Sequence, residues 1–409
     1  MTSNVRSNGN YDVCVVGGGP AGATVATFLQ RAGHRCVILE RSTFPRYHIG
    51  ESLIPHTFGT LERLGLLPKL RGSHFPEKHS VRFVSPDGTE SSPFYFSETI
   101  PGERSRTWQV ERSEFDQICL DNARESGVEV RMETGVEEVL FQNGKAVGVR
   151  VHSEDHERYE IRSRVVVDAS GFATIIGSQL KIKERIPELN KASIWSYYRG
   201  GKRLPGIDAG ETTIFMIEQR GWFWYIPLPD DTVSVGVVAS PDYLFDESEK
   251  FDTVFEREVK RCRPLLERLE GAEQTGPVRG MRRLAHRNQR IAGDGWIMIG
   301  DAAAFLDPIY SSGLFLALTS AELAADSVSA ALRADDLSAA QLGKFTGALT
   351  KGVGVIGQLI GAFYDPNFSF GAFLKRYPDQ RTALIDCLVG DVIEKDMSSF
   401  QAALTEMTS

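Results

Sequence analysis

The segment Tyr11-Asp12-Val13-Cys14-Val15-Val16-Gly17-Gly18-Gly19-Pro20-Ala21-Gly22 sets the architecture of the N-terminal part of this chain. Residues 11–16 are apolar apart from Asp12, which is typical of a strand covered on both faces. A helical pattern runs from about Pro20 to Ala32 and ends at Gly33, and a second strand at 35–39 ends in Glu40. This order predicts a βαβ unit whose glycine turn binds a dinucleotide.

Each glycine of this GxGxxG pattern has a physical role. Gly17 permits the tight turn, Gly19 lets the backbone approach a pyrophosphate, and Gly22 allows close packing of helix on strand. The helix N-terminus adds unpaired N–H groups and a positive dipole end. Glu40 is placed to accept hydrogen bonds from the ribose of an ADP moiety. FAD and NAD satisfy these residues equally, and a purely structural glycine turn is the alternative.

Two later segments favour FAD. Residues 165–171, VVVDASG, and 296–303, WIMIGDAA, each predict a buried strand that ends in a polar turn. A carboxylate at a strand end can bind a polyol hydroxyl, which the ribityl chain of FAD has and NAD lacks. No second GxGxxG follows a strand, so the chain shows little sign of a dedicated nicotinamide site.

Composition narrows the class of protein. At 409 residues the chain predicts about two or three domain-like units. A hydrophobic content of 42% and a charged content of 24% are typical of a soluble globular protein. The net charge of −8 argues against a nucleic-acid partner. Five cysteines without a CxxC pair exclude an obvious zinc site and predict buried free thiols in a reducing, cytoplasmic compartment.

We expect neither a signal peptide nor a membrane span. The N-terminal MTSNVRSNGN lacks an apolar core. No stretch approaches ~18 uninterrupted apolar residues. The apolar segment 352–363 predicts a buried helix instead.

The remaining pattern predicts an α/β protein with a second, α+β layer. Alternating segments near 80–96 and 128–167 predict antiparallel strands, and 192–239 predicts a second sheet; helices are expected at about 113–126 and 311–332. Strands of the nucleotide layer thus come from both ends of the chain. We expect a discontinuous Rossmann-like FAD-binding domain (1–75, 105–180 and 285–335), an inserted antiparallel-sheet substrate domain (76–104 and 181–284) and a helical C-terminal segment (336–409).

Two short segments suggest the chemistry. Residues 222–227 read Trp-Phe-Trp-Tyr-Ile-Pro, in which Trp222 and Trp224 can wall off a flavin from substrate; an amphipathic strand with core aromatics is the alternative. Lys78 lies between Phe75 and the apolar run 81–84. Burial there would lower the lysine pKa and expose its lone pair.

These segments resemble known flavoproteins. The strands ending at 171 and 303 look like those of FAD-dependent monooxygenase-fold proteins, of which p-hydroxybenzoate hydroxylase is the model. That resemblance implies a ribityl contact for Asp301 and a position near the flavin for Arg112, for which a solvated arginine at a helix start is the alternative. With GESLIP (50–55), FPEKHSVRFV (75–84), WxWxIP and DPIYSSG (307–313), residues 10–320 resemble flavin-dependent halogenases.

The halogenase resemblance implies an activity and its site. Reduced FAD, O₂ and a halide (chloride or bromide) would yield hypohalous acid, with the halide held by backbone N–H groups around Ser312 and Gly313. Lys78 would receive the oxidant, and Trp222 and Trp224 would keep substrate away from the flavin. Electrons would come from a separate flavin reductase. A simple N-cap by Ser311 or Ser312 remains the structural alternative.

The resemblance also narrows the substrate. Tryptophan halogenases carry a glutamate where Tyr310 stands, so the chain looks closer to halogenases of phenols and pyrroles, some of which take substrate tethered to a carrier protein. The basic stretch 279–290 can meet an acidic carrier, although a solvated surface is the more common explanation. Five aromatic residues can line an apolar pocket or simply pack helices: Phe363, Tyr364, Phe368, Phe370 and Phe373.

Three other functions stay open from the sequence. A geranylgeranyl-reductase-like flavoprotein has a related aromatic segment and a related GDAA motif. A plain aromatic hydroxylase is disfavoured by the tryptophan wall. A non-enzymatic flavin-binding protein is disfavoured by the presence of Lys78, Asp301 and WxWxIP.

Overall fold

A computed structural model describes residues 7–153, 155, 157–217, 221–245 and 249–408. Residues 1–6, which carry part of the signal-peptide expectation and the start of the first predicted domain, lie outside the described residues, as does 409 at the end of the C-terminal segment.

The predicted βαβ unit is present. β1 (Ser7–Val16) leads through the glycine turn into α1 (Pro20–Arg31), and β2 (Cys36–Leu39) pairs with β1 in parallel, with Val13 opposite Cys36. On its other side β1 pairs in parallel with β10 (Arg158–Asp168), and β10 pairs in parallel with β20 (Trp296–Met298). Strands from both ends of the chain therefore form one sheet.

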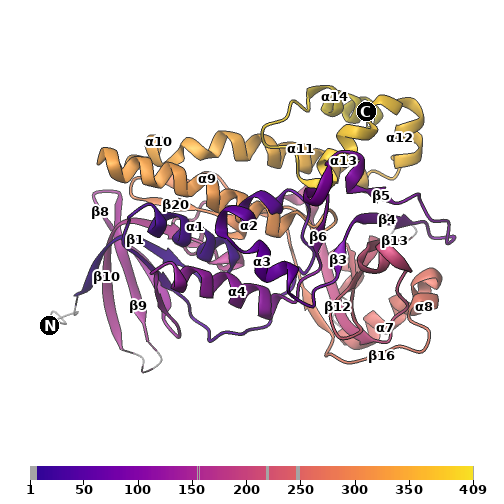
Figure 1. The fold of residues 1–409 in the computed structure, drawn as a ribbon, viewed down its shortest axis with the longest axis horizontal. Coiled ribbons are helices and arrows are strands. Elements are labelled where there is room, and N and C mark those ends of the chain that lie inside the picture. Colours follow the sequence, from indigo (N-terminus) through magenta and orange to yellow (C-terminus); the bar gives the residue numbers. More distant parts are fainter. Residues whose placement is uncertain (1–6, 154, 156, 218–220, 246–248, 409) are drawn as a thin grey trace.

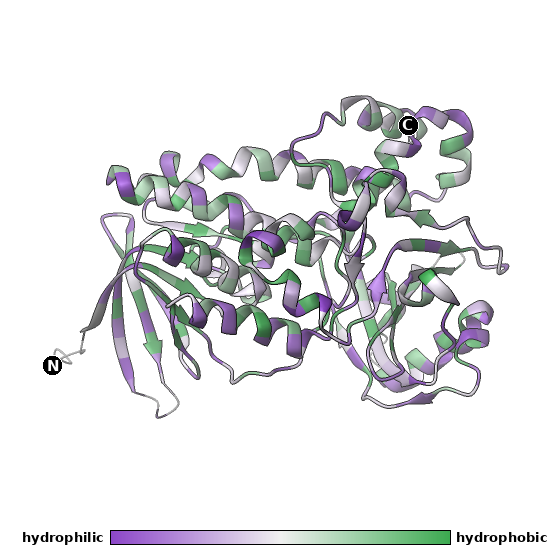
Figure 2. Ribbon diagram, viewed as in Figure 1, coloured by the Kyte–Doolittle hydropathy of each residue, from purple (hydrophilic) through white to green (hydrophobic). Residues whose placement is uncertain are grey.

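This first sheet has the order β19-β20-β10-β1-β2-β7, extended by β8 and β9. Its other strands are β7 (Glu129–Arg131), β8 (Gly135–Gln142), β9 (Lys145–His152) and β19 (Ala292–Gly293). The antiparallel prediction for 128–167 is right for the pairing of β9 with β8 and with β10. It is wrong for β7, which pairs with β2 in parallel, and for β10 against β1 and β20, where the pairing is parallel. Figure 2 shows hydrophilic and hydrophobic residues alternating along β8 and β9, as expected where one face meets solvent.

Helices cover this sheet (Figure 1). α1, α4 (Arg112–Glu125) and α9 (Ser312–Ala334) share one hydrophobic core with β1 and β10. Among the described residues, α9 is the one helix long and apolar enough to cross a membrane by length and composition, which we did not expect. In the most apolar 18-residue stretch of α9, 56% is buried, so α9 has the packing of a core helix.

The second sheet comes from the middle of the chain, as predicted, and has the order β16-β12-β15-β14-β13-β4-β5, with β17 beside β12. Its strands are β4 (Ser80–Val84), β5 (Phe94–Tyr95), β12 (Ala192–Arg199), β13 (Thr212–Ile217), β14 (Gly221–Pro227), β15 (Thr232–Ala239), β16 (Glu273–Gln274) and β17 (Arg279–Met281). β4 joins β13 in parallel, so the prediction of purely antiparallel strands in 80–96 is wrong on that side.

The C-terminal segment is helical, as predicted. Its helices are α10 (Ala339–Leu342), α11 (Thr346–Tyr364), α12 (Phe370–Arg376), α13 (Arg381–Val389) and α14 (Ser398–Met407). The predicted buried helix 352–363 lies within α11. In Figure 1 the last three helices gather beside β4 and β5. They share a hydrophobic cluster with one face of β14, so the C-terminal helices cover that face of the second sheet.

Candidate active site

The glycine turn has the geometry of a phosphate-binding loop. Gly17 has φ +103°, and a Cβ built there would lie 2.5 Å from the carbonyl oxygen of Ala169. A Cβ on Gly22 would lie 2.0 Å from the carbonyl oxygen of Gly17. No larger residue fits either position, because atoms cannot approach so closely, so the turn is built for close backbone approach.

Glu40 is buried at the end of β2 and braces this turn. Its Oε2 accepts the backbone N–H of Gly18 at 2.8 Å, and its Oε1 accepts that of Ser42 at 2.9 Å. Each carboxylate oxygen has a further lone pair, so a ribose hydroxyl can still be bound. The ribose role of Glu40 stays a prediction.

Arg46 belongs to this site and was missed from the sequence. One guanidinium nitrogen lies 3.4 Å from the Cβ position of Gly19, and the other pairs with Asp116 at 3.3 Å. A guanidinium at the glycine turn suits a pyrophosphate. Arg46 lies beyond the βαβ unit in a segment without a motif, so only the fold brings it to Gly19.

Arg112 is buried, so the alternative of a solvated arginine is wrong. It donates to both carboxylate oxygens of Asp116 at 2.8 and 3.0 Å. It also donates to the carbonyl oxygens of Ile49 and Gly50 at 2.6 and 3.2 Å. Arg112 thus joins α4 to the segment that follows Arg46.

Asp301 lies just after β20; the residue as a whole is half-buried, and its carboxyl group is the part that protein surrounds. Burial raises the pKa of its carboxyl to about 6, and the charge of Arg112 opposes that shift. Within the described part of the chain the carboxyl has no recorded hydrogen-bond partner, so it is free to bind a hydroxyl. A tight glycine turn, two arginines and a free carboxyl together fit FAD, although the ribityl role of Asp301 stays a prediction.

Lys78 is buried, with 2% of its surface exposed, although it is the last residue of the two-residue strand β3 (Glu77–Lys78). Its ammonium donates to the Oγ of Ser52 at 2.9 Å and to the carbonyl oxygen of Leu53 at 3.3 Å. The ring centroid of Phe96 lies 5.4 Å away. Burial lowers the lysine pKa to about 7, against the opposing charge of Glu211. Close to half of such an amine is neutral at pH 7.

Trp222 and Trp224 are buried on one face of β14, 6.1 Å apart between ring centroids. The indole N–H of Trp224 donates to the Oγ of Ser234 at 3.0 Å. Both rings belong to the hydrophobic cluster that includes Phe96, so the tryptophan pair and the surroundings of Lys78 are continuous. Both tryptophans are core residues, and their role as a wall between flavin and substrate stays a prediction.

The loop before α9 and the first turn of that helix hold the remaining predicted residues. Ser311 occupies the N-cap position with φ +54°, and no side-chain cap bond is formed, so the alternative of a simple serine cap is wrong. Ser312 and Gly313 are the first two residues of the helix, where backbone N–H groups lack intrahelical partners. Tyr310 is buried, with its hydroxyl 3.4 Å from the carbonyl oxygen of Leu359 and its ring edge-on to Phe363.

The five C-terminal aromatic residues form one contact network. Phe363 contacts Tyr364 and Phe370, and Phe368 contacts Phe370 and Phe373. They adjoin the same cluster as the tryptophan pair.

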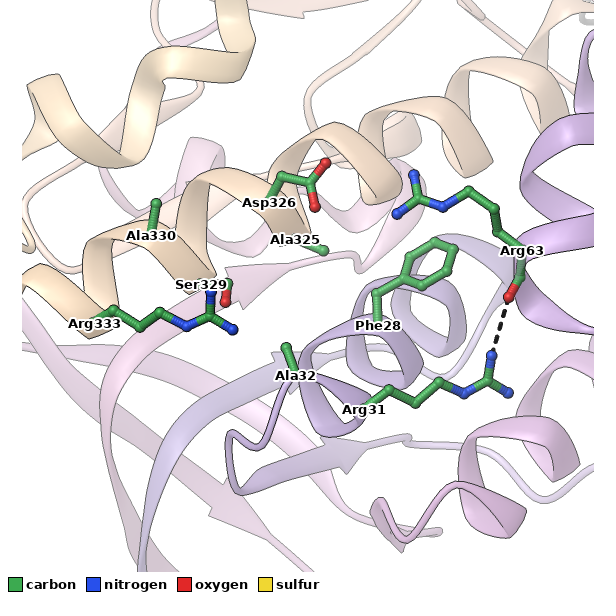
Figure 3. Close-up of a pocket in the computed structure, with 9 residues that line it drawn as sticks. All are labelled: Phe28, Arg31, Ala32, Arg63, Ala325, Asp326, Ser329, Ala330 and Arg333. Atoms are coloured by element: carbon green, nitrogen blue, oxygen red, sulfur yellow. Dashed lines mark hydrogen bonds between the residues drawn. The ribbon is translucent and has the colours of Figure 1, made fainter.

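A surface pocket of about 380 Å³ lies elsewhere, between α1, α2 (Thr57–Leu64) and α9 (Figure 3). Its lining consists of Phe28, Arg31, Ala32, Arg63, Ala325, Asp326, Ser329, Ala330 and Arg333. None of the predicted site residues lines it. Two of its arginines already have protein partners: Arg31 donates to carbonyl oxygens of α2, and Arg63 pairs with Glu322. The pocket is therefore given no functional role.

Comparison with known proteins agrees with this geometry. The family model of the FAD binding domain matches residues 10–338. The chain belongs to this class of FAD-binding proteins. Within it, the chain is 30% identical over 407 residues to a 1H-pyrrole-2-carbonyl-[peptidyl-carrier protein] chlorinase of Pseudomonas fluorescens, covering 94% of this chain and 90% of that one. It is 34% identical to a 1H-pyrrole-2-carbonyl-[peptidyl-carrier protein] brominase of Pseudoalteromonas luteoviolacea, covering 80% and 79%.

Comparison with solved structures gives the same family as the comparison of sequences. The flavin-dependent brominase Bmp2 superposes with a TM-score of 0.88 at 29% identity, covering 97% of this chain and 99% of that one. The chain is a member of the flavin-dependent halogenases, and hence an FAD-dependent halogenating oxidoreductase that uses a halide. This membership decides against the reductase, hydroxylase and non-enzymatic alternatives.

Proposed function

We propose that this halogenase transfers its halogen through Lys78 to an electron-rich ring of the pyrrole or phenol class, presented on a carrier protein. The observation that carries the proposal is the Lys78 amine, buried against Phe96 with a pKa near 7. Most lysines are solvated and charged, and an amine so poised near neutral pH is characteristic of functional sites.

Bound FAD, in its reduced form, would supply the activation of O₂. The chain's own residues do the rest. Backbone N–H groups at Ser312 and Gly313 would hold the halide. Trp222 and Trp224 would exclude substrate and water from the flavin. When hypohalous acid reaches a neutral Lys78, an N–halogen bond forms, the O–halogen bond breaks and water leaves; alternatively the amine holds the acid by hydrogen bonding.

The proposed substrate class rests on Tyr310 and on the relatives. A tyrosine cannot supply the carboxylate that tryptophan-type enzymes have at this position, so we infer a ring activated by its own N–H or O–H. The chlorinase and brominase relatives are named for a pyrrolyl group carried on a protein. Arg279 and Arg282 are exposed and stack on Tyr47 and Phe245, and this basic surface suits an acidic carrier.

We further propose that a separate flavin reductase supplies reduced FAD, and that the enzyme works in the cytoplasm. All five cysteines are buried and unpaired, which suits a reducing compartment.

The experiment compares wild type with Lys78→Ala, using a flavin reductase, chloride or bromide, and pyrrole-2-carbonyl or hydroxybenzoyl groups either free or loaded on a carrier protein. We expect halogenated carrier-bound product from wild type only, while both proteins bind FAD equally. Halogenated product from Lys78→Ala at the wild-type rate would refute the role of Lys78. A preference for the free acids would refute the carrier.

A further inference from the structure

His48 lies close to the two arginines of the cofactor site, Arg46 and Arg112, whose charges both act on its imidazole ring. Its ring nitrogen Nδ1 lies 2.7 Å from the carbonyl oxygen of Ile49. A guanidinium nitrogen of Arg112 donates to the same oxygen at 2.6 Å. His48 and Arg112 therefore meet at one backbone oxygen, whose two lone pairs are both used.

The contact with Ile49 determines which ring nitrogen of His48 carries the proton. A backbone carbonyl oxygen can only accept a hydrogen bond, so Nδ1 must be the protonated nitrogen. Burial lowers the His48 pKa to about 4, helped by the charges of Arg112 and Arg46. The charge of Asp116 and the hydrogen bond to Ile49 oppose this shift but do not cancel it. The ring is therefore neutral at pH 7, and its Nε2 keeps a bare lone pair that can only accept.

The Nε2 of His48 has no hydrogen-bond partner among the described residues, and protein does not fully enclose it. The residue as a whole is half-buried. The hydrogen bond of Nδ1 meanwhile fixes the orientation of the ring. A fixed lone pair that can be reached from outside, and that no protein group satisfies, is suited to a ligand that brings its own hydroxyl or N–H group.

The surroundings of His48 indicate which part of FAD lies nearest. Arg46 lies at the glycine turn, where a pyrophosphate would pass. The charge of Arg112 acts on both His48 and Asp301, and Asp301 follows β20. Glu40, predicted for the adenosine ribose, follows β2, which lies on the other side of β1 from β20. His48 is thus associated with the flavin half of FAD and not with its adenosine half.

We propose that His48 is a cofactor-binding residue whose Nε2 accepts a hydrogen bond from a hydroxyl or N–H group of the flavin half of FAD. The ribityl hydroxyls and the flavin ring supply such donors. FAD binding follows from the family of the chain, so this role of His48 does not depend on the role of Lys78.

Two substitutions separate this role from a purely structural one. Asparagine places an amide nitrogen where Nδ1 stands, so His48→Asn keeps a donor for Ile49 but has no atom at the Nε2 position. Glutamine places its amide oxygen where Nε2 stands, so His48→Gln keeps the acceptor and loses the bond to Ile49. The dissociation constant of FAD is measured by fluorescence quenching. We expect it to rise about fivefold or more in His48→Asn and to change less than about twofold in His48→Gln.

A structural role through Ile49 predicts the reverse order. Wild-type affinity in His48→Asn, or a loss in His48→Gln as large as that in His48→Asn, overturns the proposal. ADP lacks the flavin half, so its dissociation constant, measured by competition with FAD, should be the same for wild type and His48→Asn. A matching loss of ADP affinity would place the contact on the adenosine half and overturn the assignment.

The protonation of His48 can be observed directly. Long-range ¹H–¹⁵N NMR of the flavin-free protein with ¹⁵N-labelled histidine should show a protonated Nδ1 and a bare Nε2, assigned by their absence in His48→Gln. Addition of FAD should move the bare-nitrogen signal upfield, because accepting a hydrogen bond shields the nitrogen. A protonated Nε2, or a bare nitrogen that does not respond to FAD, contradicts the proposal.

Discussion

Trp222 donates its indole N–H to the hydroxyl of Tyr364 at 2.8 Å, and that hydroxyl donates to a carboxyl oxygen of Asp307 at 3.0 Å. The ammonium of Lys191 lies 3.9 Å from the centroid of the Tyr364 ring. Tyr364 thus joins strand β14, which carries Trp222, to the end of α11 and to the loop that leads into α9. Burial raises the pKa of Asp307 to about 7.

Removal of this hydroxyl tests the junction. Tyr364→Phe keeps the ring but leaves Trp222 and Asp307 without their partner, so we expect the free energy of unfolding to fall by about 1–3 kcal/mol. Urea unfolding measures it. Tyr198→Phe, whose hydroxyl has no recorded hydrogen-bond partner among the described residues, should change stability by less. Equal losses in the two variants would contradict a structural role for the Trp222–Tyr364–Asp307 contact.

The pH dependence of halogenation should follow Lys78. Burial places its pKa at about 7, and only the neutral amine can attack the oxidant. The rate should therefore rise with pH through about 7 and level off above it. Lys78→Arg stays charged at every pH and should be inactive throughout. A flat profile, or an active arginine variant, would contradict the neutral-amine mechanism.

The same burial should cost stability. The folded-state pKa lies below the ordinary value of 10.5, so the unfolded chain binds more protons between about pH 7 and 10.5, and stability rises with pH in that window. Lys78→Met removes the free-energy cost of burying an ammonium. Part of this gain is lost because Ser52 and Leu53 no longer receive a hydrogen bond from Lys78. We expect a gain of about 2–4 kcal/mol below pH 7 that shrinks toward pH 10.5. Denaturant unfolding at several pH values checks this; a destabilised variant at pH 6 would be contrary evidence.

The buried ion pair Arg112–Asp116 should stabilise the folded protein far more than the exposed pair Arg124–Asp121 on the same helix, α4. Arg112→Ala leaves Asp116 buried with only the more distant Arg46, so we expect a loss of about 3–5 kcal/mol together with weaker FAD binding. Arg124→Ala breaks an exposed pair with Asp121 and should cost at most about 1 kcal/mol. Thermal unfolding and flavin absorbance measure both. Comparable losses would mean that burial does not matter here.

Gly22→Ala should abolish FAD binding, because the new methyl group would meet the carbonyl oxygen of Gly17 at 2.0 Å. Gly59→Ala is the matched control: Gly59 lies in α2 with nothing within 4 Å of its Cβ position, and alanine favours a helix. Flavin absorbance after gel filtration separates the two. A yellow Gly22→Ala protein would show that the turn can relax.

The local sequence pattern was sufficient to predict much of the fold. The strand, glycine turn and helix at 11–32 lie within one stretch of chain, and their conformations follow from side-chain periodicity and from the absence of Cβ atoms. The parallel pairing of β7 with β2 did not follow, because the alternating pattern reports which face is buried and not which strand lies alongside. Arg46 escaped notice for a similar reason, since its neighbour Gly19 is distant in sequence.

The sequence by itself determined the identity of the chemical groups: a glycine turn for a dinucleotide, a lysine between apolar residues, and two tryptophans two positions apart on one face of a strand. Only the tertiary structure decided their state. The Lys78 amine is shifted toward neutrality because Ser52, Leu53 and Phe96 lie against it from other parts of the chain and its burial removes it from water. Desolvation depends on neighbours in space, which no local pattern encodes.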